Sequence, residues 1–228
     1  MAMRKLGQKH IEGIIHCTSG LRIGGSDEEL SIGGADLTCI KHPGTGTPYI
    51  PGTSLKGKMR AELEKRLGKM NGSEPCGCGR TDCLVCRVFG PHKNVQHALG
   101  PTRIIVRDAQ FRDGKDAPPP EHRFETKTEN LIDRKTGTAM HPRRVERVTA
   151  GTEFTLKIGI QHWDLDQGCT YTSSGGKAFT GVDALVEFVK DGLREIQDTG
   201  IGSGVSKGSG EVELRELTFD GVPFDLQA

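Results

Sequence analysis

The sequence has few aromatic residues and almost no net charge. Aromatic residues make up 5% of the 228 residues, with a single tryptophan, and the formal net charge is +1. Total charge therefore gives no sign of a nucleic-acid-binding protein, and any basic surface must be local. The scarcity of aromatic side chains also argues against an ordinary RNA-recognition motif, because such sheets stack bases on aromatic residues.

Long apolar segments are missing as well. No apolar run approaches the roughly 20 residues that a helix needs to cross a bilayer, and the start, MAMRKLGQKH, leads into no apolar core of a secretion signal. We therefore expect a cytoplasmic protein without a membrane partner. The cysteines number seven, and an odd number without a secretion signal favours free thiols or a metal site over a disulfide framework.

Periodic patterns predict four strands and two helices. The strands are expected at residues 8–17, 102–111, 152–161 and 211–219, and the helices within 48–70 and at 181–200. Thr53 or Ser54 is expected to cap the first helix. Three polar stretches without periodicity are expected to be irregular, and the second of them mobile: 71–100, 113–141 and 166–180.

The predicted order of elements is strand, helix, strand, strand, helix, strand. This is the ferredoxin-like (RRM-like) β-α-β-β-α-β arrangement, in which two helices cover one face of a four-stranded sheet. We therefore expect one α+β domain over residues 1–228. Its insertions are expected at about 71–100 and 113–150, and long insertions in a compact domain are usually functional or disordered.

Residues 51–60, PGTSLKGKMR, come close to a phosphate-binding P-loop. Gly52, Gly57 and Lys58 match the pattern G-x-x-x-x-G-K-[ST], but Met59 stands where the loop needs a hydroxyl group to hold magnesium. Met59 also belongs to the apolar stripe of the predicted helix. Hydrolysis of a nucleoside triphosphate is therefore the weaker interpretation of this stretch.

The same stretch places three cations at the start of a helix. Lys56, Lys58 and Arg60 lie within five residues, and the unpaired first amides and the dipole of a helix favour an anion. The arrangement suits a nucleic-acid phosphate. The alternative is a solvated cationic face, balanced by Glu62 and Glu64.

A second glycine-rich loop precedes the last predicted strand. It reads IGSGVSKGSGEV and carries Lys207, and its small residues let backbone amides approach a phosphate closely. Alone, such a loop is more often a flexible turn. Two such loops in one ferredoxin-like core favour RNA binding through backbone contacts, without base reading.

Four of the cysteines lie close together in the sequence, at positions 76, 78, 83 and 86. Cys83 and Cys86 form a C-x-x-C half-site, and a glycine between Cys76 and Cys78 permits their tighter spacing. Zinc takes four such ligands in a structural site and would stabilise an insertion that lacks a core. His92 is a candidate to replace Cys76 or Cys78, and a redox-active C-x-x-C is the alternative.

Residues 141–160, HPRRVERVTAGTEFTLKIGI, predict a β-hairpin. Val145 and Val148 precede a turn at Gly151, and the alternating strand follows. Three arginines stand at the entrance of the hairpin: Arg143, Arg144 and Arg147. Arginine is suited to phosphate contacts and to stacking on bases, whereas the alternative is a charged edge strand that discourages aggregation.

Four motifs occur along the chain: IGGAD (32–36), PYIPGTSLKGKMR (48–60), RVFG (87–90) and GSGVSKGSGEV (202–212). In this combination and order they resemble the RAMP superfamily of CRISPR proteins, and more narrowly the backbone subunit of the type III-A (Csm) interference complex. The resemblance implies a palm that grips a guide RNA, a hairpin thumb that disrupts the guide–target duplex, and a filament of copies along the guide. It also implies three further partners beside the target RNA: a large polymerase-like signalling subunit, a small helical subunit and end-capping RAMP subunits.

The resemblance also implies a catalytic residue. An aspartate in the loop after the first strand cleaves target RNA with a divalent metal, Mg²⁺ or Mn²⁺, and this aspartate falls on Asp36. Without the resemblance, Asp36 is more simply a turn-capping residue. The residues expected to contact RNA are Arg22, Ser54, Lys56, Lys58, Arg60, Arg143, Arg144, Gly204, Ser206, Lys207 and Gly208. The nearby acids Asp27, Glu28 and Glu29 rank below Asp36, as a solvated loop, and His16 is better explained by a structural or RNA-contacting role.

Three alternatives to a guide-binding subunit with nuclease activity stay open at this point. The first is a purely structural subunit of the same filament, and the second is a guide-processing endoribonuclease of the same superfamily. The third is an enzyme that hydrolyses nucleoside triphosphates with the incomplete P-loop.

Overall fold

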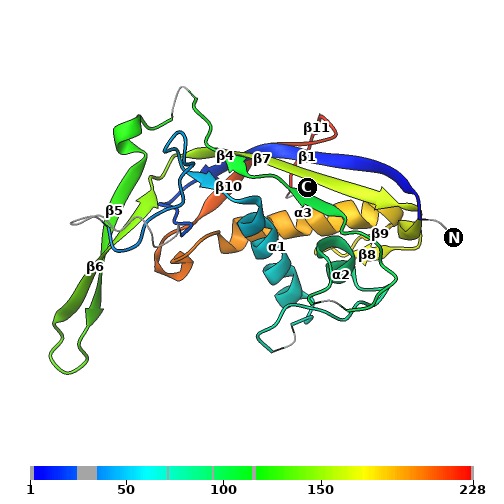
Figure 1. Ribbon diagram of the computed structural model, residues 1–228, viewed down its shortest axis with the longest axis horizontal. Helices are drawn as coiled ribbons and strands as arrows, with labels where there is room; N and C mark the ends of the chain where they lie inside the picture. Colours follow the sequence, from blue (N-terminus) through cyan, green and yellow to red (C-terminus); the bar gives the residue numbers. More distant parts are fainter. Residues whose placement is uncertain (1–2, 25–34, 71, 94, 115–116, 227–228) are drawn as a thin grey trace.

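An antiparallel sheet of five strands forms one layer of the protein, and three helices lie beneath it (Figure 1). The computed structural model describes residues 3–24, 35–70, 72–93, 95–114 and 117–226. The strand order is β11 (Val222–Pro223), β10 (Val212–Phe219), β1 (Lys5–Cys17), β7 (Glu153–Trp163) and β3 (Ile104–Val106). The helices are α1 (Gly52–Arg66), α2 (Leu84–Phe89) and α3 (Gly181–Thr199).

Alternation along β1 and β7 gives the sheet one apolar and one polar face. Phe154 and Ile158 of β7 lie opposite Ile15 and Ile11 of β1, and all four side chains are fully buried or nearly so. Leu156 is buried on the same face, whereas Thr155 and Lys157 point to the other one, since successive side chains of a strand alternate. On that outer face Glu12 lies opposite Lys157, and the two form an ion pair at 3.7 Å.

The two long helices bury the stripes that their periodicity predicted. In α3, Leu185, Phe188, Val189, Leu193 and Ile196 are all buried, which confirms the second predicted helix. In α1, Leu55, Met59 and Leu63 are buried, whereas Leu67 follows the helix and is exposed. These stripes pack α1 against α3 and both against the apolar face of the sheet, which excludes this surface from water.

The expected cap of α1 by Thr53 or Ser54 is wrong. Both residues lie inside the helix, whose N-cap is Pro51. The first N–H, that of Gly52, instead donates to the Asp108 carboxylate at 2.7 Å. Asp108 can accept this hydrogen bond because the backbone before it packs closely against the start of α1. A Cβ on Gly52 would lie 2.3 Å from the carbonyl oxygen of Val106.

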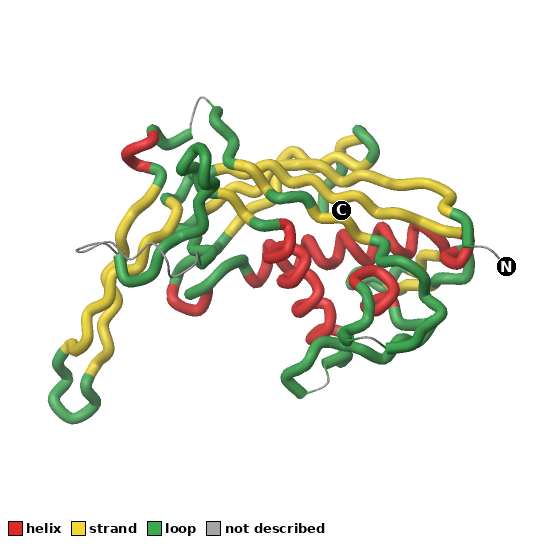
Figure 2. The backbone as a smooth tube through the Cα atoms, in the orientation of Figure 1, coloured by secondary structure: helices red, strands yellow, loops and turns green. Residues whose placement is uncertain are grey.

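Stretches expected to be irregular contain short elements, and one predicted strand is broken. The strand expected at 102–111 is divided into β3 and β4 (Ala109–Gln110), and β4 pairs with β2 (Tyr49–Ile50). The stretch 71–100 contains α2, and 166–180 contains the hairpin of β8 (Thr170–Thr172) and β9 (Ala178–Thr180). Figure 2 shows these pieces joined by long loops around the regular core. Short 3₁₀ turns complete the connections, η2 (Pro120–His122), η3 (Asp164–Asp166) and η4 (Val205–Lys207).

A long two-stranded hairpin projects from the body of the protein (Figure 1). Its strands are β5 (Phe124–Ile132) and β6 (Ala139–Val148), so the expectation of a loop over 113–141 is wrong. The predicted hairpin turn at Gly151 is also wrong, because Val148 pairs with Phe124 and β6 does not pair with β7. No side chain of β5 is fully buried, so its sequence lacks the alternation of apolar and polar residues that would have revealed a strand.

A buried carboxylate joins α1, α3 and the β8–β9 hairpin. Asp191 is fully buried on α3 and accepts hydrogen bonds from Arg66 (2.6 Å), the Tyr171 hydroxyl (2.5 Å), the backbone and hydroxyl of Ser174, and Arg194. Burial raises the pKa of Asp191, but these donors outweigh it and lower the pKa to about 2.

A second buried network joins α2 to the edge of the sheet. Arg103, fully buried beside β3, donates to both carboxylate oxygens of Asp166, and Arg87 of α2 donates to Asp166 at 2.8 Å. Burial of two guanidinium groups requires such a partner. Arg87 belongs to the RVFG motif, so this motif has a structural role. Within the described residues, no helix has the length and hydropathy of a bilayer-crossing segment.

Replacement of Asp191 by Asn should destabilise the protein by roughly 3 kcal/mol, since a buried charge network loses its acceptor. Thermal or urea unfolding measures this loss. The stabilisation by the carboxylate is present above its ordinary pKa of 3.8 and is lost as the pH falls through about 2. Glu12→Gln is the control, because Glu12 pairs with Lys157 at the solvated face and should change stability by less than about 0.5 kcal/mol. Equal losses in both variants would contradict the structural role of Asp191.

Candidate nucleic-acid interface and metal centre

The segment that carries Asp36 runs along one edge of β6. Asp36 donates its N–H to the Arg144 carbonyl (2.9 Å) and accepts the Arg144 N–H on Oδ2 (2.6 Å). Leu37 bridges Val145 in parallel. The Asp36 side chain is exposed, and among the described residues its second oxygen, Oδ1, receives no hydrogen bond. The competing acids Asp27, Glu28 and Glu29, and residues 32–34 of the IGGAD motif, lie outside the described residues.

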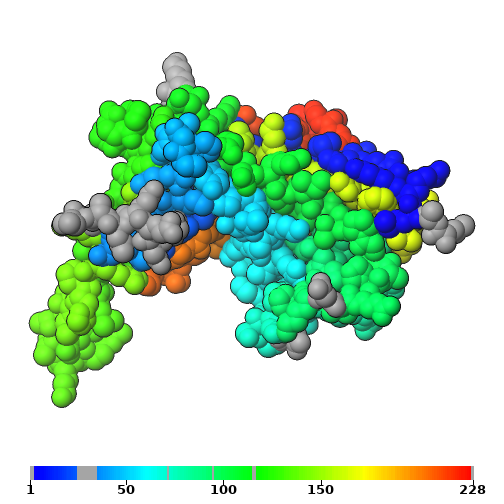
Figure 3. Space-filling view, in the orientation of Figure 1, coloured from blue at the N-terminus to red at the C-terminus, as the bar shows by residue number. Residues whose placement is uncertain are grey.

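The rest of this segment is anchored to the base of the hairpin. Lys41 pairs with Glu146 at 3.0 Å and lies 4.5 Å above the ring of Phe124. The same Glu146 accepts the N–H of Cys39 at 2.9 Å. Figure 3 shows the residues before α1, in light blue, filling the space between the hairpin and the helix. Asp36 is thus fixed by β6, which the sequence did not indicate.

The glycine-rich loop after α3 packs against the loop after β1. Arg22 donates to the Ser203 hydroxyl at 2.8 Å, and the Ser203 N–H donates to the Arg22 carbonyl at 2.8 Å. The approach is close, since a Cβ on Gly202 would lie 2.3 Å from that carbonyl oxygen. The Nε atom of Arg22 is buried without a partner in the described residues. A half-buried guanidinium group with an unused donor is suited to an anion.

The tip of the glycine-rich loop lies at the base of the hairpin. Gly204 and Gly208 adopt left-handed conformations, with φ of 78°, on either side of Ser206 and Lys207, which are exposed. The Lys207 carbonyl accepts a hydrogen bond from Lys127 of β5 at 2.6 Å. The structure thus brings this loop, predicted to contact RNA, to the β5–β6 hairpin.

The hairpin arginines have intramolecular partners. Arg143 pairs with Glu129 at 2.8 Å. Arg147 pairs with Glu125 at 2.6 Å and donates to the Ser209 hydroxyl at 3.1 Å. The backbone of Arg144 pairs with Asp36. Two further residues join this surface: Ser203 of the glycine-rich loop through its contact with Arg22, and Lys127 of β5 through its contact with the Lys207 carbonyl. No sequence pattern marked either as a contact residue.

The cations near the start of α1 differ in whether a carboxylate pairs with them. Lys58 pairs with Glu62 at 2.7 Å, and Arg60 pairs with Glu64 at 2.7 Å. Lys56 has no carboxylate partner in the part of the chain that the structure describes. Burial, and then repulsion from Arg60, lower the pKa of Lys56. A bound anion would offset both effects, so Lys56 is suited to an anionic ligand.

The structure excludes a working P-loop at residues 51–60. The helix begins at Gly52, so Gly57 and Lys58 lie in its second turn and no loop precedes them to surround a phosphate. Ser54 is exposed in the first turn, where helix amides can bind an anion. Hydrolysis of nucleoside triphosphates is therefore not supported by the geometry.

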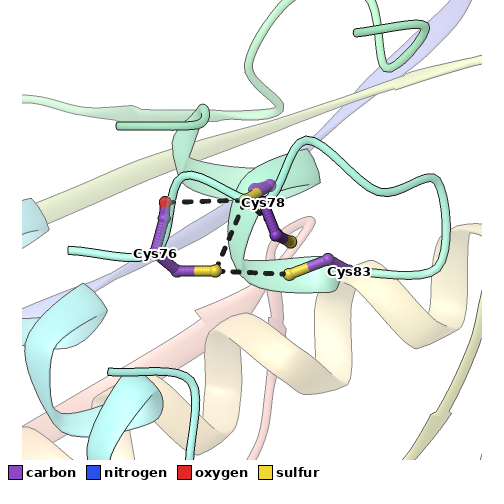
Figure 4. Close-up of side chains that lie close together, drawn as sticks. Cys76, Cys78 and Cys83 are labelled. Carbon is purple, nitrogen blue, oxygen red and sulfur yellow. Dashed lines mark hydrogen bonds between the residues drawn. The ribbon is translucent and has the colours of Figure 1, made fainter. Parts of the chain in front are cut away.

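The four clustered cysteines converge at one point. Their Sγ atoms all lie within 4.8 Å of one another. The Sγ of Cys76 is 3.9 Å from that of Cys83 (Figure 4). The Sγ of Cys86 is 3.7 Å from that of Cys76 and 3.7 Å from that of Cys78. Ligands at the Zn–S distance of ~2.3 Å in a tetrahedron would be separated by about 3.8 Å. The geometry thus fits a metal such as zinc.

His92 is not part of this cluster. Its backbone N–H donates to the Cys76 carbonyl at 3.1 Å, and its imidazole does not belong to the group of four ligands found within the described residues. Burial raises the pKa of Cys83 to about 11 and raises the pKa of Cys86. Thiols of this kind release their protons when a metal binds.

Comparisons with known proteins place the chain in a family. A profile of the RAMP superfamily matches residues 14–213. Proteins named "CRISPR system Cms endoribonuclease Csm3" are similar to it: that of Methanothermobacter thermautotrophicus is 35% identical, over 94% of this chain and 86% of its own length. That of Methanocaldococcus jannaschii is 34% identical, over 92% and 80%. The crystal structure of a Csm3–Csm4 subcomplex in the type III-A CRISPR-Cas interference complex matches with a TM-score of 0.56 and 25% identity, over 96% of this chain and 80% of that one. The chain therefore belongs to the RAMP superfamily.

Proposed function

We propose that this protein is the backbone subunit of a type III CRISPR effector complex, which binds a guide RNA and cleaves the target RNA paired with it. The observation that carries the proposal is the exposed Asp36 carboxylate, held by the backbone of β6 where the hairpin and the glycine-rich loop meet. The endoribonuclease names of the relatives and the type III-A complex of the structural neighbour support it.

RNA is held through its sugar–phosphate backbone. Arg22, Lys56 and Lys207 supply positive charge. The first turn of α1 and the glycines at 204 and 208 let RNA phosphates come close to main-chain N–H groups. The outer face of the sheet is polar and offers no row of aromatic side chains for base stacking. Binding of this kind is independent of base sequence, as a subunit that accepts any guide requires.

The palm is a ferredoxin-like domain. Four strands of the sheet lie side by side in the order β10-β1-β7-β3. Along the chain, these are the fourth, first, third and second of the four predicted strands. The helices α1 and α3 cover one face and connect the strands in the order of two βαβ halves. The β5–β6 hairpin is the thumb.

Asp36 is the ligand for a catalytic Mg²⁺ or Mn²⁺. Magnesium is typically held by one or two carboxylates together with substrate phosphates, and Asp36 has one carboxylate oxygen bound to the backbone and one exposed. The bound metal would stabilise negative charge on the phosphate that is cleaved. The chain itself contributes the fixed carboxylate and the cations that align the strand beside it.

The cysteine cluster is a structural zinc site. Four ligand sulfurs leave no open coordination position, which distinguishes a structural site from a catalytic one. Zinc would hold together the loops of the insertion at 71–100, where α2 is the one helix or strand among the described residues.

The proposed complex contains further copies of this chain along the guide, a large polymerase-like signalling subunit, a small helical subunit and end-capping RAMP subunits, in the cytoplasm. The purely structural subunit and the guide-processing endoribonuclease remain alternatives. The guide-processing enzyme would cleave a repeat-containing precursor without a metal.

Asp36→Ala should abolish cleavage of the target RNA and leave RNA affinity within about twofold, because one exposed carboxylate is removed and no cation is lost. Denaturing electrophoresis of a target paired with the guide in the assembled complex measures the evenly spaced cuts. Asp113→Ala is the control, since Asp113 is also exposed and contacts only Arg123 at 3.6 Å among the described residues. Persistent cuts in Asp36→Ala would favour the purely structural role of this residue.

Lys56→Ala should weaken binding of single-stranded RNA equally for different sequences. Each phosphate contact in a single strand contributes about 0.7 to the slope of log K against log salt, so the variant should have a slope shallower by roughly that amount. Fluorescence anisotropy at several salt concentrations measures both quantities. Lys157→Ala, on the outer sheet face, should leave them unchanged. A loss that depends on the RNA sequence would be inconsistent with backbone recognition.

Cys83→Ser should reduce bound zinc to well below one ion per chain and lower the melting temperature, because a structural site loses one of its four thiolates. Metal analysis by atomic emission of the purified protein measures the zinc. Cys169→Ser is the matched control, since Cys169 is buried but lies outside the cluster. Full zinc occupancy in Cys83→Ser would show that this sulfur is not a ligand.

A further inference from the structure

The metal cluster is joined to the cationic helix by a three-residue bridge of Arg60, Glu64 and Cys76. Glu64 Oε1 accepts the Nε–H of Arg60 at 2.7 Å and the backbone N–H of Cys76 at 2.9 Å. Arg60 also donates to the Cys76 carbonyl at 2.7 Å. Both backbone polar groups of a cluster cysteine are therefore held by α1.

The bridge is shielded from solvent. The Glu64 side chain is 5% exposed and the Arg60 side chain 17%. A buried carboxylate is unfavourable unless donors surround it, and hydrogen bonds are stronger in such an environment. The position of Arg60 is therefore sensitive to the position of the Cys76 backbone.

The cluster determines where that backbone lies. Cys76 Sγ contacts the sulfurs of Cys83 and Cys86, which belong to the start and the middle of the α2 region. Thiol contacts of 3.7 to 3.9 Å are weak, whereas a shared metal ion would hold the same atoms firmly. Loss of the metal would free the Cys76 side chain from α2 and leave its backbone held by α1 and by the N–H of His92, which donates to the Cys76 carbonyl.

The other end of the bridge acts on Lys56. Lys56 lies one turn before Arg60 on the same helix face, and the two cations repel each other. The Arg60 guanidinium is directed toward Glu64 and the Cys76 carbonyl, which keeps it bound within the protein. A displaced Arg60 would change both the space and the electrostatic potential at Lys56.

We propose that Arg60 is a positioning residue, and that metal occupancy of the cysteine cluster sets the RNA affinity of α1 through the Arg60–Glu64–Cys76 bridge. This inference rests on the proposed contact between α1 and RNA. The expectation that Arg60 itself contacts a phosphate is thereby revised. Arg60 connects the loop of the cysteine cluster to α1 and positions Lys56, which contacts the phosphate.

A thermodynamic cycle tests the coupling. The affinity of the full-length protein for a fluorescent single-stranded RNA is measured with zinc bound and after removal of zinc by a zinc-selective chelator. We expect removal to weaken binding about tenfold in the wild type, a coupling of ordinary size. In Glu64→Gln, and in Arg60→Gln as a second variant of the bridge, removal should change affinity by less than about twofold, because the connection is already broken.

Glu62→Gln is the matched control. Glu62 lies on the same helix, is buried, and pairs with Lys58 and Lys65, outside the bridge, so zinc removal should weaken its binding as it does in the wild type. Arg60→Gln should also keep the salt slope of the wild type, whereas Lys56→Ala should not. An equal effect of zinc removal in all four proteins, as general unfolding would give, overturns the proposal, and so does no effect in the wild type. Absence of RNA binding by the zinc-loaded wild type would instead overturn the proposed function on which it rests.

Discussion

The arrangement of the site depends on backbone hydrogen bonds along the edge of β6 that β5 leaves open. Leu21 and Val148 exchange two such bonds, and Asp36 is paired with Arg144 further along the same strand. A backbone edge has fixed spacing, so it determines the separation of the residues that attach to it. The loop after β1 and the segment of Asp36 have little regular structure of their own. They are held in place because β6 provides the donors and acceptors that they lack internally.

Charge in this protein is local and largely compensated. The net charge is close to zero, but the cations fall into two sets. Most have a carboxylate partner, as Arg143 has in Glu129, whereas a smaller set, such as Lys56, has none in the described residues. In the first set, the ion pair holds the cationic side chain in one position. Cations of the second set are open to a ligand. Composition alone cannot separate the two sets, since both contain the same residue types. The distinction depends on which side chains the fold brings within about 4 Å of each other.

The sequence predicted the regular core and much less of the site. The alternation from Phe154 to Ile160 and the stripe from Leu185 to Ile196 are buried as expected, because one face of each element is shielded from water. A hairpin was predicted here, but strand β5 was missed because none of its side chains is buried. The cysteine spacing predicted the cluster correctly, since four ligands within eleven residues need only a local loop to converge. The bridge from Arg60 to Cys76 was not predictable, since it depends on how the insertion folds back on α1.

The hairpin has a further consequence for how movement could spread through the molecule. It is a ribbon of two strands that is fastened at its base, by the contacts of Val145 and Val148 with Leu37 and Leu21, while its far end stands clear of the body. Such a ribbon behaves as a stiff arm with a short pivot, so a small rotation at the pivot becomes a large sweep at the tip. The pivot also belongs to β6, the strand whose backbone holds Asp36. Whatever tilts the arm must therefore turn the carboxylate with it.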